Sequence, residues 1–158
     1  SWGIPQELVA KGLASFGGVP HRLQPVAERD GVLWVNDSKA TNVAAAVVAL
    51  RSFGDRPVHV ILGGTGKGED YGPLREPLAA YAHRAYVIGD EAGRIASAID
   101  DVVAVTRSGT LEQAVADARE ASAAGDVILL APACASYDQF RDFEHRGQVF
   151  TDMARTAI

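Results

Sequence analysis

Three short polar turns carry side chains that could bind an anionic ligand. The first turn, residues 36–42, reads NDSKATN and holds a carboxylate, two hydroxyls, an ammonium group and two amides. The second turn, residues 63–68, reads GGTGKG, and the third turn, residues 132–136, reads PACAS. Each turn directly follows an apolar run typical of a strand. Free N–H groups at the start of the helix after the first turn, together with Lys39 and Lys67, are therefore expected to attract carboxylates or phosphates.

A plain helix N-cap is the alternative interpretation of the first turn, and Asp37, Ser38 or Thr41 could supply it. For one turn alone, a cap is the more common outcome. Three such turns after three strands favour a ligand site, because ligands of open α/β sheets bind beyond the carboxyl ends of the strands. We expect Ser136 to be exposed at that edge and Asp138 to cap the last helix.

The second turn resembles a phosphate-binding loop but does not match its pattern. Ile61 stands where the pattern G-x-x-x-x-G-K-[ST] needs its first glycine, and Gly68 replaces the hydroxyl that binds Mg²⁺. The glycine spacing also fails the dinucleotide-binding fingerprint. We therefore expect an anion-binding loop in which Lys67 faces a carboxylate or phosphate, and no ATP held by this segment alone.

The remaining reactive side chains favour structural roles. Cys134 follows a buried strand and no nearby base accompanies it, so we expect a packed residue. His59 and His83 lie within or beside apolar segments and are expected to be structural, and no spacing of His and Cys predicts a metal site. Arg22 is either a surface charge or a phosphate ligand, and the sequence does not decide between them.

Composition excludes several classes of protein. The chain has 158 residues, 47% hydrophobic and 22% charged, which suits one globular domain over residues 1–158. A net charge of −5 argues against binding to nucleic acid. No apolar run approaches the roughly 20 residues of a membrane span, and the single cysteine cannot form an internal disulfide. The expected setting is a reducing cytosol.

Hydrophobic periodicity predicts alternating strands and helices. A helix is expected over residues 5–16, followed by two antiparallel strands joined by an Asp-Gly turn, residues 22–27 and 32–35. Helices are then expected at 43–52, 73–83, 92–99, 110–124 and from about 138, and strands at 58–62, 84–88, 102–106 and 126–131. This pattern predicts a three-layer, Rossmann-like α/β fold whose six-stranded sheet is mostly parallel with one antiparallel strand.

The residue motifs in these turns resemble those in the C-terminal domain of the Mur ligase family, in particular those of its D-glutamate-adding branch. The similar segments are Pro20-His21-Arg22, DSKATN at 37–42, GGxGKG at 63–68 and PACASYDQFRDFEHRG at 132–147. They occur in the family's order, and the resemblance extends from about Gly12 to the end of the chain. It implies an ATP-dependent amide ligase of peptidoglycan synthesis in the bacterial cytoplasm.

The resemblance also implies a reaction and partners. ATP phosphorylates the carboxylate of UDP-MurNAc-L-alanine, and the amine of D-glutamate attacks the acyl phosphate. The chain corresponds to the third of three domains. Its partners would be an N-terminal UDP-binding domain and a central ATPase domain, which would hold most of the ATP and Mg²⁺. This chain alone is expected to be inactive and to bind neither cofactor.

Site residues follow from the resemblance by position. The family's D-glutamate ligands fall on Lys39, Thr41, Lys67, Ser136 and Phe143. Its nucleotide contacts fall on Arg22, facing the γ-phosphate, and Asp37, facing the ribose, and the catalytic residues are then Arg22 and Lys39. Phe140 is expected in the core, while the backbone near Phe143 lines the ligand site.

This sequence departs from the family pattern at a few positions. Thr65 stands where aspartate is common, Glu69-Asp70-Tyr71 replaces the usual Ala-Asp-Phe, and Gln148-Val149 stands where an acidic residue is frequent. Thr65 could change how Lys67 is held. Two alternatives stay open: another amide ligase of the same superfamily, such as one adding glutamate to folate, and a stand-alone binding module without turnover.

Overall fold

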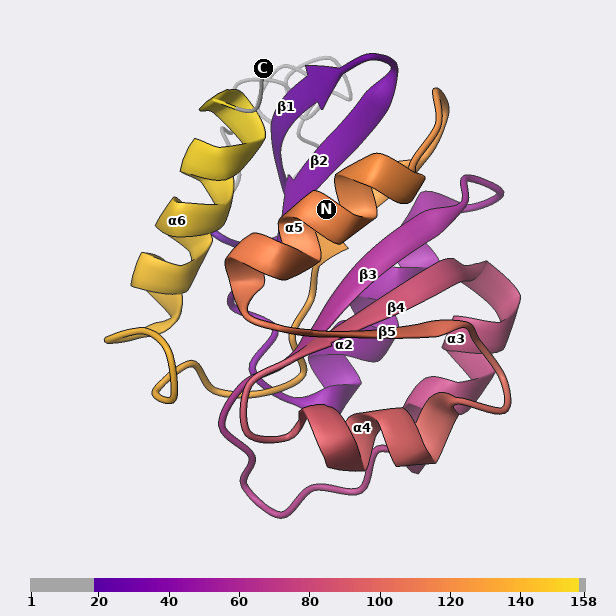
Figure 1. Cartoon of the computed structure of the whole chain (residues 1–158), viewed down its shortest axis with the longest axis vertical. Coiled ribbons are helices and arrows are strands. Elements are labelled where there is room, and N and C mark those ends of the chain that lie inside the picture. The colour runs from indigo at the N-terminus through magenta and orange to yellow at the C-terminus, as the bar shows by residue number, and fades with distance from the viewer. Residues whose placement is uncertain (1–18, 157–158) are drawn as a thin grey trace, which may run out of the picture.

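A six-stranded sheet with the strand order β1-β2-β6-β3-β4-β5 forms the middle of the molecule. We describe residues 19–156 of a computed structural model, so the helix expected over 5–16 lies outside the described residues. The strands are β1 Gln24–Arg29, β2 Val32–Asn36, β3 Val58–Gly63, β4 Ala82–Ile88, β5 Val105–Gly109 and β6 Val127–Leu130 (Figure 1). β1 pairs antiparallel with β2 and every other pairing is parallel, as the alternation predicted.

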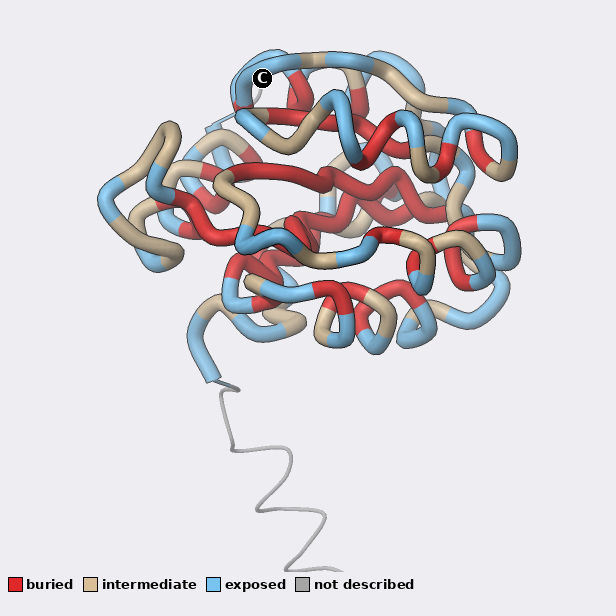
Figure 2. The backbone as a smooth tube through the Cα atoms, turned by 90° about the horizontal axis from the view of Figure 1, so that it is seen from below, coloured by how far each residue is buried: buried red, intermediate tan, exposed pale blue. Residues whose placement is uncertain are grey.

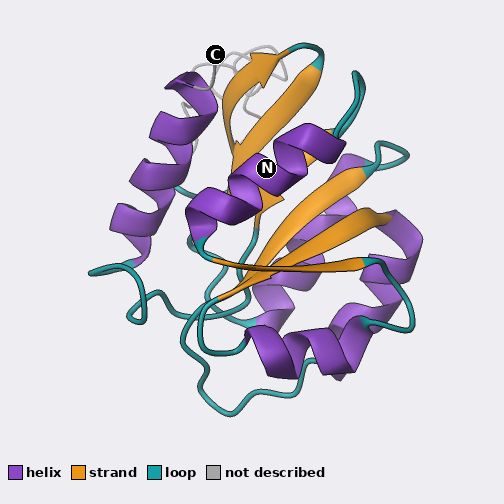
Figure 3. Ribbon diagram, viewed as in Figure 1, coloured by secondary structure: helices purple, strands orange, loops and turns teal. Residues whose placement is uncertain are grey.

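Helices cover both faces of this sheet (Figure 3). They are α2 Val43–Leu50, η1 Arg51–Phe53, η2 Gly72–Leu74, α3 Arg75–Tyr81, α4 Ala92–Ile99, α5 Leu111–Ala121 and α6 Phe143–Thr156. Leu50, Leu78 and Ile95 from α2, α3 and α4 pack into one apolar cluster. Leu111 of α5 and Phe150 of α6 belong to a second cluster. The predicted three-layer α/β fold is confirmed, with the buried strands in the middle (Figure 2).

The β1–β2 hairpin forms where the Asp-Gly step predicted it. Asp30 and Gly31 have φ values of 52° and 77°, and Arg29 pairs with Val32 across the turn. Two successive positive φ values match the right-handed twist of the flanking strands, and an Asp-Gly step adopts them at low cost. This hairpin directs β2 so that it runs parallel to β6.

Several boundaries differ from the predicted ones. β5 spans Val105–Gly109 and not 102–106, because residues after α4 first turn back onto it, with Val102 N–H donating to Ile99 O at 3.0 Å. The helix expected over 73–83 begins with the short η2 and gives way to β4 at Ala82. The last helix begins at Phe143 and not near 138, since the intervening residues form a loop.

Asp142, and not Asp138, caps α6. His145 N–H donates to Asp142 Oδ1 at 2.7 Å in the first turn of the helix. Asp138 instead accepts the N–H of Asp90 at 3.1 Å, which connects the 137–142 loop to the end of β4. The expected cap was wrong because a long-range partner competes for the Asp138 carboxylate.

Candidate functional site

The three polar turns meet at one edge of the sheet. β2, β6 and β3 are neighbours and run parallel, so their carboxyl ends lie together. The third turn, after β6, lies between the other two. It bonds to the first turn through Ala133 N–H and Ala40 O at 2.9 Å, and Asp37 N–H donates to Leu130 O at 2.9 Å. The tertiary structure therefore brings together what the sequence separates by about a hundred residues.

The second turn bonds to the third from the other side. Gly63 N–H donates to Pro132 O at 2.8 Å, and Thr65 and Ala135 exchange two backbone hydrogen bonds of 2.9 and 3.1 Å. Gly64, with φ of 135°, allows this approach, because a Cβ atom there would lie 2.1 Å from Ala135 O. Gly64 thus has a packing reason that does not depend on any ligand.

Arg146 of α6 reaches into the site and connects the first and third turns. Its guanidinium is fully buried and donates to Ser38 Oγ and Ser38 O at 2.9 Å each. It also donates to Ala135 O and Cys134 O at 3.1 Å each. Burial lowers the pKa of Arg146 to about 10, so the group is still charged at neutral pH.

Asn36, the last residue of β2, attaches α6 to the sheet. Its Nδ2 donates to Gly147 O at 2.9 Å and to Thr151 Oγ1 at 3.1 Å, and lies 3.0 Å from His21 Nδ1. Its Oδ1 accepts the N–H of Ser38 at 3.0 Å. Sequence reasoning did not single out Asn36 or Arg146. The sequence signals that could have identified them are a polar residue at the end of an apolar strand and an arginine on the apolar side of the last helix.

Lys39 and Phe143 lie beside one another at the surface of the first turn. Lys39 is exposed, and its ammonium lies 5.8 Å from the centre of the Phe143 ring. Phe143 O accepts the hydroxyl of Ser38 at 2.8 Å, and the ring of His21 packs edge-on against Phe143. The fold therefore places these two candidate ligand residues next to each other.

Arg22 and Asp37 form the neighbouring part of the edge. Asp37 is 5% exposed and accepts the N–H of Leu23 at 3.2 Å. Burial raises the pKa of Asp37 above its ordinary value, while the Leu23 hydrogen bond and the charge of Arg22 act in the opposite direction. Arg22 itself is exposed. The Arg22 guanidinium is close enough to lower the pKa of the Asp37 carboxylate by its charge. Among residues 19–156, the two groups do not share a hydrogen bond.

The backbone is strained around these residues. His21, Leu23 and Ala133 have φ values of 60°, 41° and 59°, a region that side chains other than glycine rarely occupy. Two of them flank Arg22, and the third lies in the third turn. Such residues occur preferentially in binding and catalytic sites, where the surrounding structure maintains them.

The N-terminus of α2 is capped differently from the sequence expectation. Asn42, and not Asp37, Ser38 or Thr41, accepts a first-turn N–H group, that of Ala45, at 2.8 Å. The carboxylate of Glu69 accepts the N–H of Val43 at 2.9 Å. Part of the anion-binding capacity expected of this helix end is thus used by the chain's own side chains. Thr41 is half-buried and free of the capping role.

Lys67 and Ser136 differ in their exposure to solvent. Lys67 is exposed, and within residues 19–156 its ammonium forms no hydrogen bond or ion pair. Ser136 is only 2% exposed, so the expectation that it stands exposed at the edge is wrong. The following loop folds back over it, with Phe140 N–H donating to Ser136 O at 2.8 Å.

Cys134 is a packed residue, as expected. It is 2% exposed, its Sγ lies 3.2 Å from Tyr71 Oη, and burial raises its pKa to about 11. A thiol with that pKa stays protonated at neutral pH and is a poor nucleophile. In the part of the chain that the structure describes, no group of three or more His, Cys, Asp or Glu side chains is arranged to hold a metal ion.

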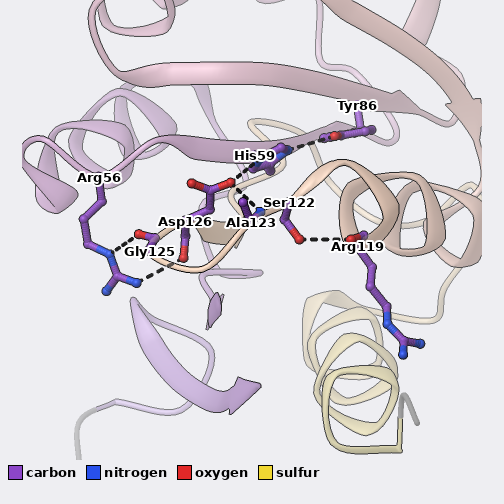
Figure 4. Close-up of polar contacts among 8 residues, drawn as sticks. All are labelled: Arg56, His59, Tyr86, Arg119, Ser122, Ala123, Gly125 and Asp126. Atoms are coloured by element: carbon purple, nitrogen blue, oxygen red, sulfur yellow. Dashed lines mark hydrogen bonds and ion pairs between the residues drawn. The ribbon is translucent and has the colours of Figure 1, made fainter. Parts of the chain in front are cut away.

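A second polar cluster lies at the opposite end of the strands (Figure 4). His59, fully buried near the start of β3, lies 2.9 Å from Tyr86 Oη through Nδ1 and 3.1 Å from Asp126 Oδ2 through Nε2. Arg56 donates to Gly125 O at 2.7 Å beside them. The structural role expected for His59 is consistent with this network, which is remote from the three turns.

Comparison with known proteins identifies the family. Residues 21–134 match the glutamate ligase domain of the Mur ligases. The chain is 48% identical over 153 residues to the UDP-N-acetylmuramoylalanine--D-glutamate ligase of Thiobacillus denitrificans, covering 96% of this chain and 32% of that protein. The corresponding protein of Legionella pneumophila (strain Lens) is 45% identical over 97% of this chain and 35% of its own length. The chain therefore spans about a third of these curated relatives.

Solved structures agree on the fold. The bifunctional folylpolyglutamate synthase/dihydrofolate synthase of Yersinia pestis CO92 superposes with a TM-score of 0.66 at 20% identity, covering 100% of this chain and 36% of that one. A murein peptide ligase from Psychrobacter arcticus 273-4 gives 0.57 at 15% identity, over 94% and 33% of the two chains. The match to the glutamate ligase domain covers well over half of the residues of this chain, and the chain therefore belongs to the Mur ligase family.

Proposed function

We propose that this chain is the D-glutamate-binding part of an ATP-dependent amide ligase, and that the whole enzyme adds D-glutamate to UDP-N-acetylmuramoyl-L-alanine in peptidoglycan synthesis. The observation that carries the proposal is the meeting of three polar turns at the ends of β2, β6 and β3, with Lys39 and Lys67 in two of them. Identities of 48% and 45% to D-glutamate ligases support this amino acid over folate chemistry, since the folylpolyglutamate synthase of similar fold is 20% identical.

D-Glutamate carries two carboxylates, and the turns offer two ammonium groups to receive them. Lys39 and Lys67 are both exposed and can form charge-assisted hydrogen bonds. Thr41 and Ser136 add hydroxyl donors, and Phe143 lines the site beside Lys39. Ser136 is only 2% exposed in this structure, so its hydroxyl would have to become accessible when the amino acid binds. Lys39 also acts on the reacting acyl group by stabilising developing negative charge.

Arg22 and Asp37 are assigned to the nucleotide. Arg22 neutralises the γ-phosphate as charge moves to the leaving group, and Asp37 accepts hydrogen bonds from the ribose hydroxyls. ATP and Mg²⁺ are held mainly by a central ATPase domain, because the described part of this chain has no metal-ligand cluster and its glycine turn lacks the phosphate-loop pattern. When bound, Mg²⁺ supplies charge neutralisation for phosphoryl transfer.

Domain closure completes the site in this proposal. An N-terminal UDP-binding domain and the central domain bring the sugar nucleotide and ATP to the edge formed by the three turns, and closure excludes water from the acyl phosphate. We infer a bacterial cytoplasmic location, where ATP and the UDP-linked substrate would be available. No helix in residues 19–156 combines the length and apolarity that crossing a bilayer requires.

Steady-state kinetics of the full-length enzyme test the residue assignments. Lys67→Ala is expected to raise the KM for D-glutamate about tenfold, because it removes a charge-assisted contact made in the ground state. Arg22→Ala should act on kcat or the KM for ATP instead. Arg51→Ala, which removes a surface cation paired with Glu76, is the control and should leave all three parameters near their starting values.

The choice of amino acid is tested in the same assay. The unchanged enzyme should form an amide with D-glutamate and UDP-MurNAc-L-alanine, and much less with L-glutamate. Amide formation on a folate substrate, or unchanged kinetics in both the Lys67 and Arg22 variants, would contradict the proposal.

A further inference from the structure

The second turn is connected to α2 by one side chain that no site assignment includes. Glu69 follows Lys67 by two residues, and its Oε2 accepts the N–H of Val43, the first residue of α2, at 2.9 Å. Val43 comes two residues after Thr41, in the segment that also carries Lys39. One carboxylate therefore connects the two turns that provide both lysines of the proposed D-glutamate site.

Resting on the proposed function, we propose that Glu69 is a positioning residue for D-glutamate: its carboxylate fixes the Lys67 turn against the start of α2 and so sets the separation of Lys67 from Lys39 and Thr41. A ligand with two carboxylates requires cationic partners at a separation that the ligand can span. Lys67 lies in a turn with glycine on both sides, which cannot keep that separation by itself.

The same stretch of chain is bonded on its other side to α4. Arg94 Nη2 donates to Glu69 O at 3.1 Å, so both the backbone and the side chain of Glu69 are engaged. Arg94 Nη1 also binds Glu91 Oε2 at 2.6 Å, and Tyr71 Oη donates to the same oxygen at 2.8 Å. These bonds place Glu69 between α2 and α4, along which the loop after β3 runs (Figure 1).

Glu91 supports the turn just before Lys67. Its N–H donates to Gly64 O at 3.1 Å, and its side chain lies directly against Gly66, where a Cβ atom would be 2.3 Å from Glu91 Cδ. Lys67 thus follows Gly66, which packs against Glu91 at the start of α4. Two residues after Lys67, Glu69 is bonded to the start of α2. Since Lys67 itself is exposed and forms no bond within residues 19–156, these neighbours determine where its backbone lies.

The test measures how the full-length ligase uses D-glutamate and ATP when the Glu69–Val43 bond is removed from either side. Glu69→Ala is expected to raise the KM for D-glutamate about fivefold, with kcat and the KM for ATP within about twofold. Glu69→Gln keeps an acceptor oxygen on a side chain of the same length, so it should restore most of the affinity. Glu76→Ala, which removes a surface carboxylate paired with Arg51, is the control.

Val43→Pro removes the donor without removing Glu69. Proline is tolerated at the first helical position, and Asn42 before it has the extended conformation that a following proline requires, with φ −142° and ψ 164°. Val43→Ala corrects for the lost side chain. Relative to Val43→Ala, Val43→Pro should raise the KM for D-glutamate about as much as Glu69→Ala does, and combining Glu69→Ala with Val43→Pro should add little, because both delete one bond.

Each outcome decides between a positioning role and its alternatives. Equal changes in the parameters for ATP and D-glutamate, additive effects of the two substitutions, or an unchanged KM in Glu69→Ala would overturn the role. A lower KM in Glu69→Ala would mean that the carboxylate occupies space needed by the substrate, and would also overturn it. If the unchanged enzyme ligates D-glutamate, only this inference fails; if it does not, the proposed function fails first.

Discussion

Arg146 keeps a guanidinium group closed off from water between the first and third turns. Moving a charged group out of water is costly, and here it is offset by hydrogen bonds to Ser38, Ala135 and Cys134. The bonded acceptors include three backbone carbonyls of loop residues, of which Ala135 O also accepts the N–H of Thr65. At the scale of the residue, the arginine therefore fixes the shape of the loops and does not need to touch a ligand.

Replacing Arg146 should unfold the chain more easily. Arg146→Met keeps much of the apolar stem but leaves several buried acceptors without a donor, so we expect a loss of about 3 kcal/mol in the free energy of unfolding. Urea denaturation followed by circular dichroism measures it. Arg141→Met, in the exposed loop before α6, is the matched control and should change stability by less than about 0.5 kcal/mol.

Helix α6 approaches the end of β2 closely, and Gly147 makes this approach possible. A Cβ atom at Gly147 would lie 2.3 Å from His21 Nδ1 and 3.0 Å from Asn36 Nδ2. Gly93 in α4 is the opposite case, because no atom lies within 4 Å of its Cβ position. Packing therefore requires a glycine at position 147 of α6 but does not require one at position 93 of α4.

Alanine at these two positions should have opposite effects on stability. Gly93→Ala is expected to stabilise by about 0.5–1 kcal/mol, since alanine restricts the unfolded chain and favours the helix. Gly147→Ala should destabilise by about 1–2 kcal/mol, because α6 must shift away from Asn36. Paired thermal or urea melts of both variants measure the difference, and a stabilising Gly147→Ala would contradict the close contact.

β3, β4 and the start of β6 are joined at the other end of the sheet by His59. Burial lowers the pKa of His59 below 6.5, and the charges of His83 and Arg84 act in the same direction, while Asp126 opposes them. Tyr86, with a pKa raised to about 12 by burial, stays neutral. The unfolded chain therefore binds a proton more readily than the folded chain does near pH 6.

The free energy of unfolding should decrease as the pH is lowered, because the folded state disfavours protonation of this histidine. The contribution of His59 is fully present above its unfolded pKa of about 6.5, and it is lost as pH falls from there towards the lower folded pKa. His59→Gln should flatten the dependence of the free energy of unfolding on pH in this range. His83→Gln, which removes one exposed charge that lowers the pKa of His59, should change the slope less than His59→Gln does. Equal slopes in His59→Gln and the parent would exclude His59 as the source.

At the scale of the whole molecule, two apolar clusters on the two faces of a six-stranded sheet are enough for a folding unit. In the proposed function, by contrast, the ligand edge would be one wall of a site that other domains complete. The 158-residue chain should therefore fold by itself while hydrolysing no ATP and forming no amide. Cooperative melting together with a phosphate-release assay tests both expectations, and measurable ATP turnover would contradict the second.

Binding of D-glutamate to the isolated chain should be weak. One open wall engages few atoms of a small amino acid, so a Kd near or above about 1 mM is expected. NMR titration should shift the amides of Lys39, Thr41, Lys67 and Ser136, with smaller changes for L-glutamate. Tight binding to an unrelated surface would contradict the assignment of the site.

The sequence by itself determined the order of strands and helices, the antiparallel hairpin and the three polar turns. These features depend on local patterns: apolar runs, the Asp-Gly step and glycine or proline at element ends. The family resemblance followed from the residue motifs of those turns. The boundary at β5 was placed wrongly because Val102 and Val103 bond back to Ile99 at the end of α4. The boundary at α6 was placed wrongly because Asp138 bonds to Asp90, a distant residue that no local pattern records.

Only the tertiary structure decided how the turns are joined. The burial of Ser136 and the bond of Glu69 to the first N–H group of α2 depend on segments separated in sequence. The same holds for the bonds of Arg146 and Asn36 that attach α6. Which of these hydrogen bonds form depends on competition among all donors and acceptors that packing brings within reach of one another. The sequence specifies which donors and acceptors are present but not the distances between them.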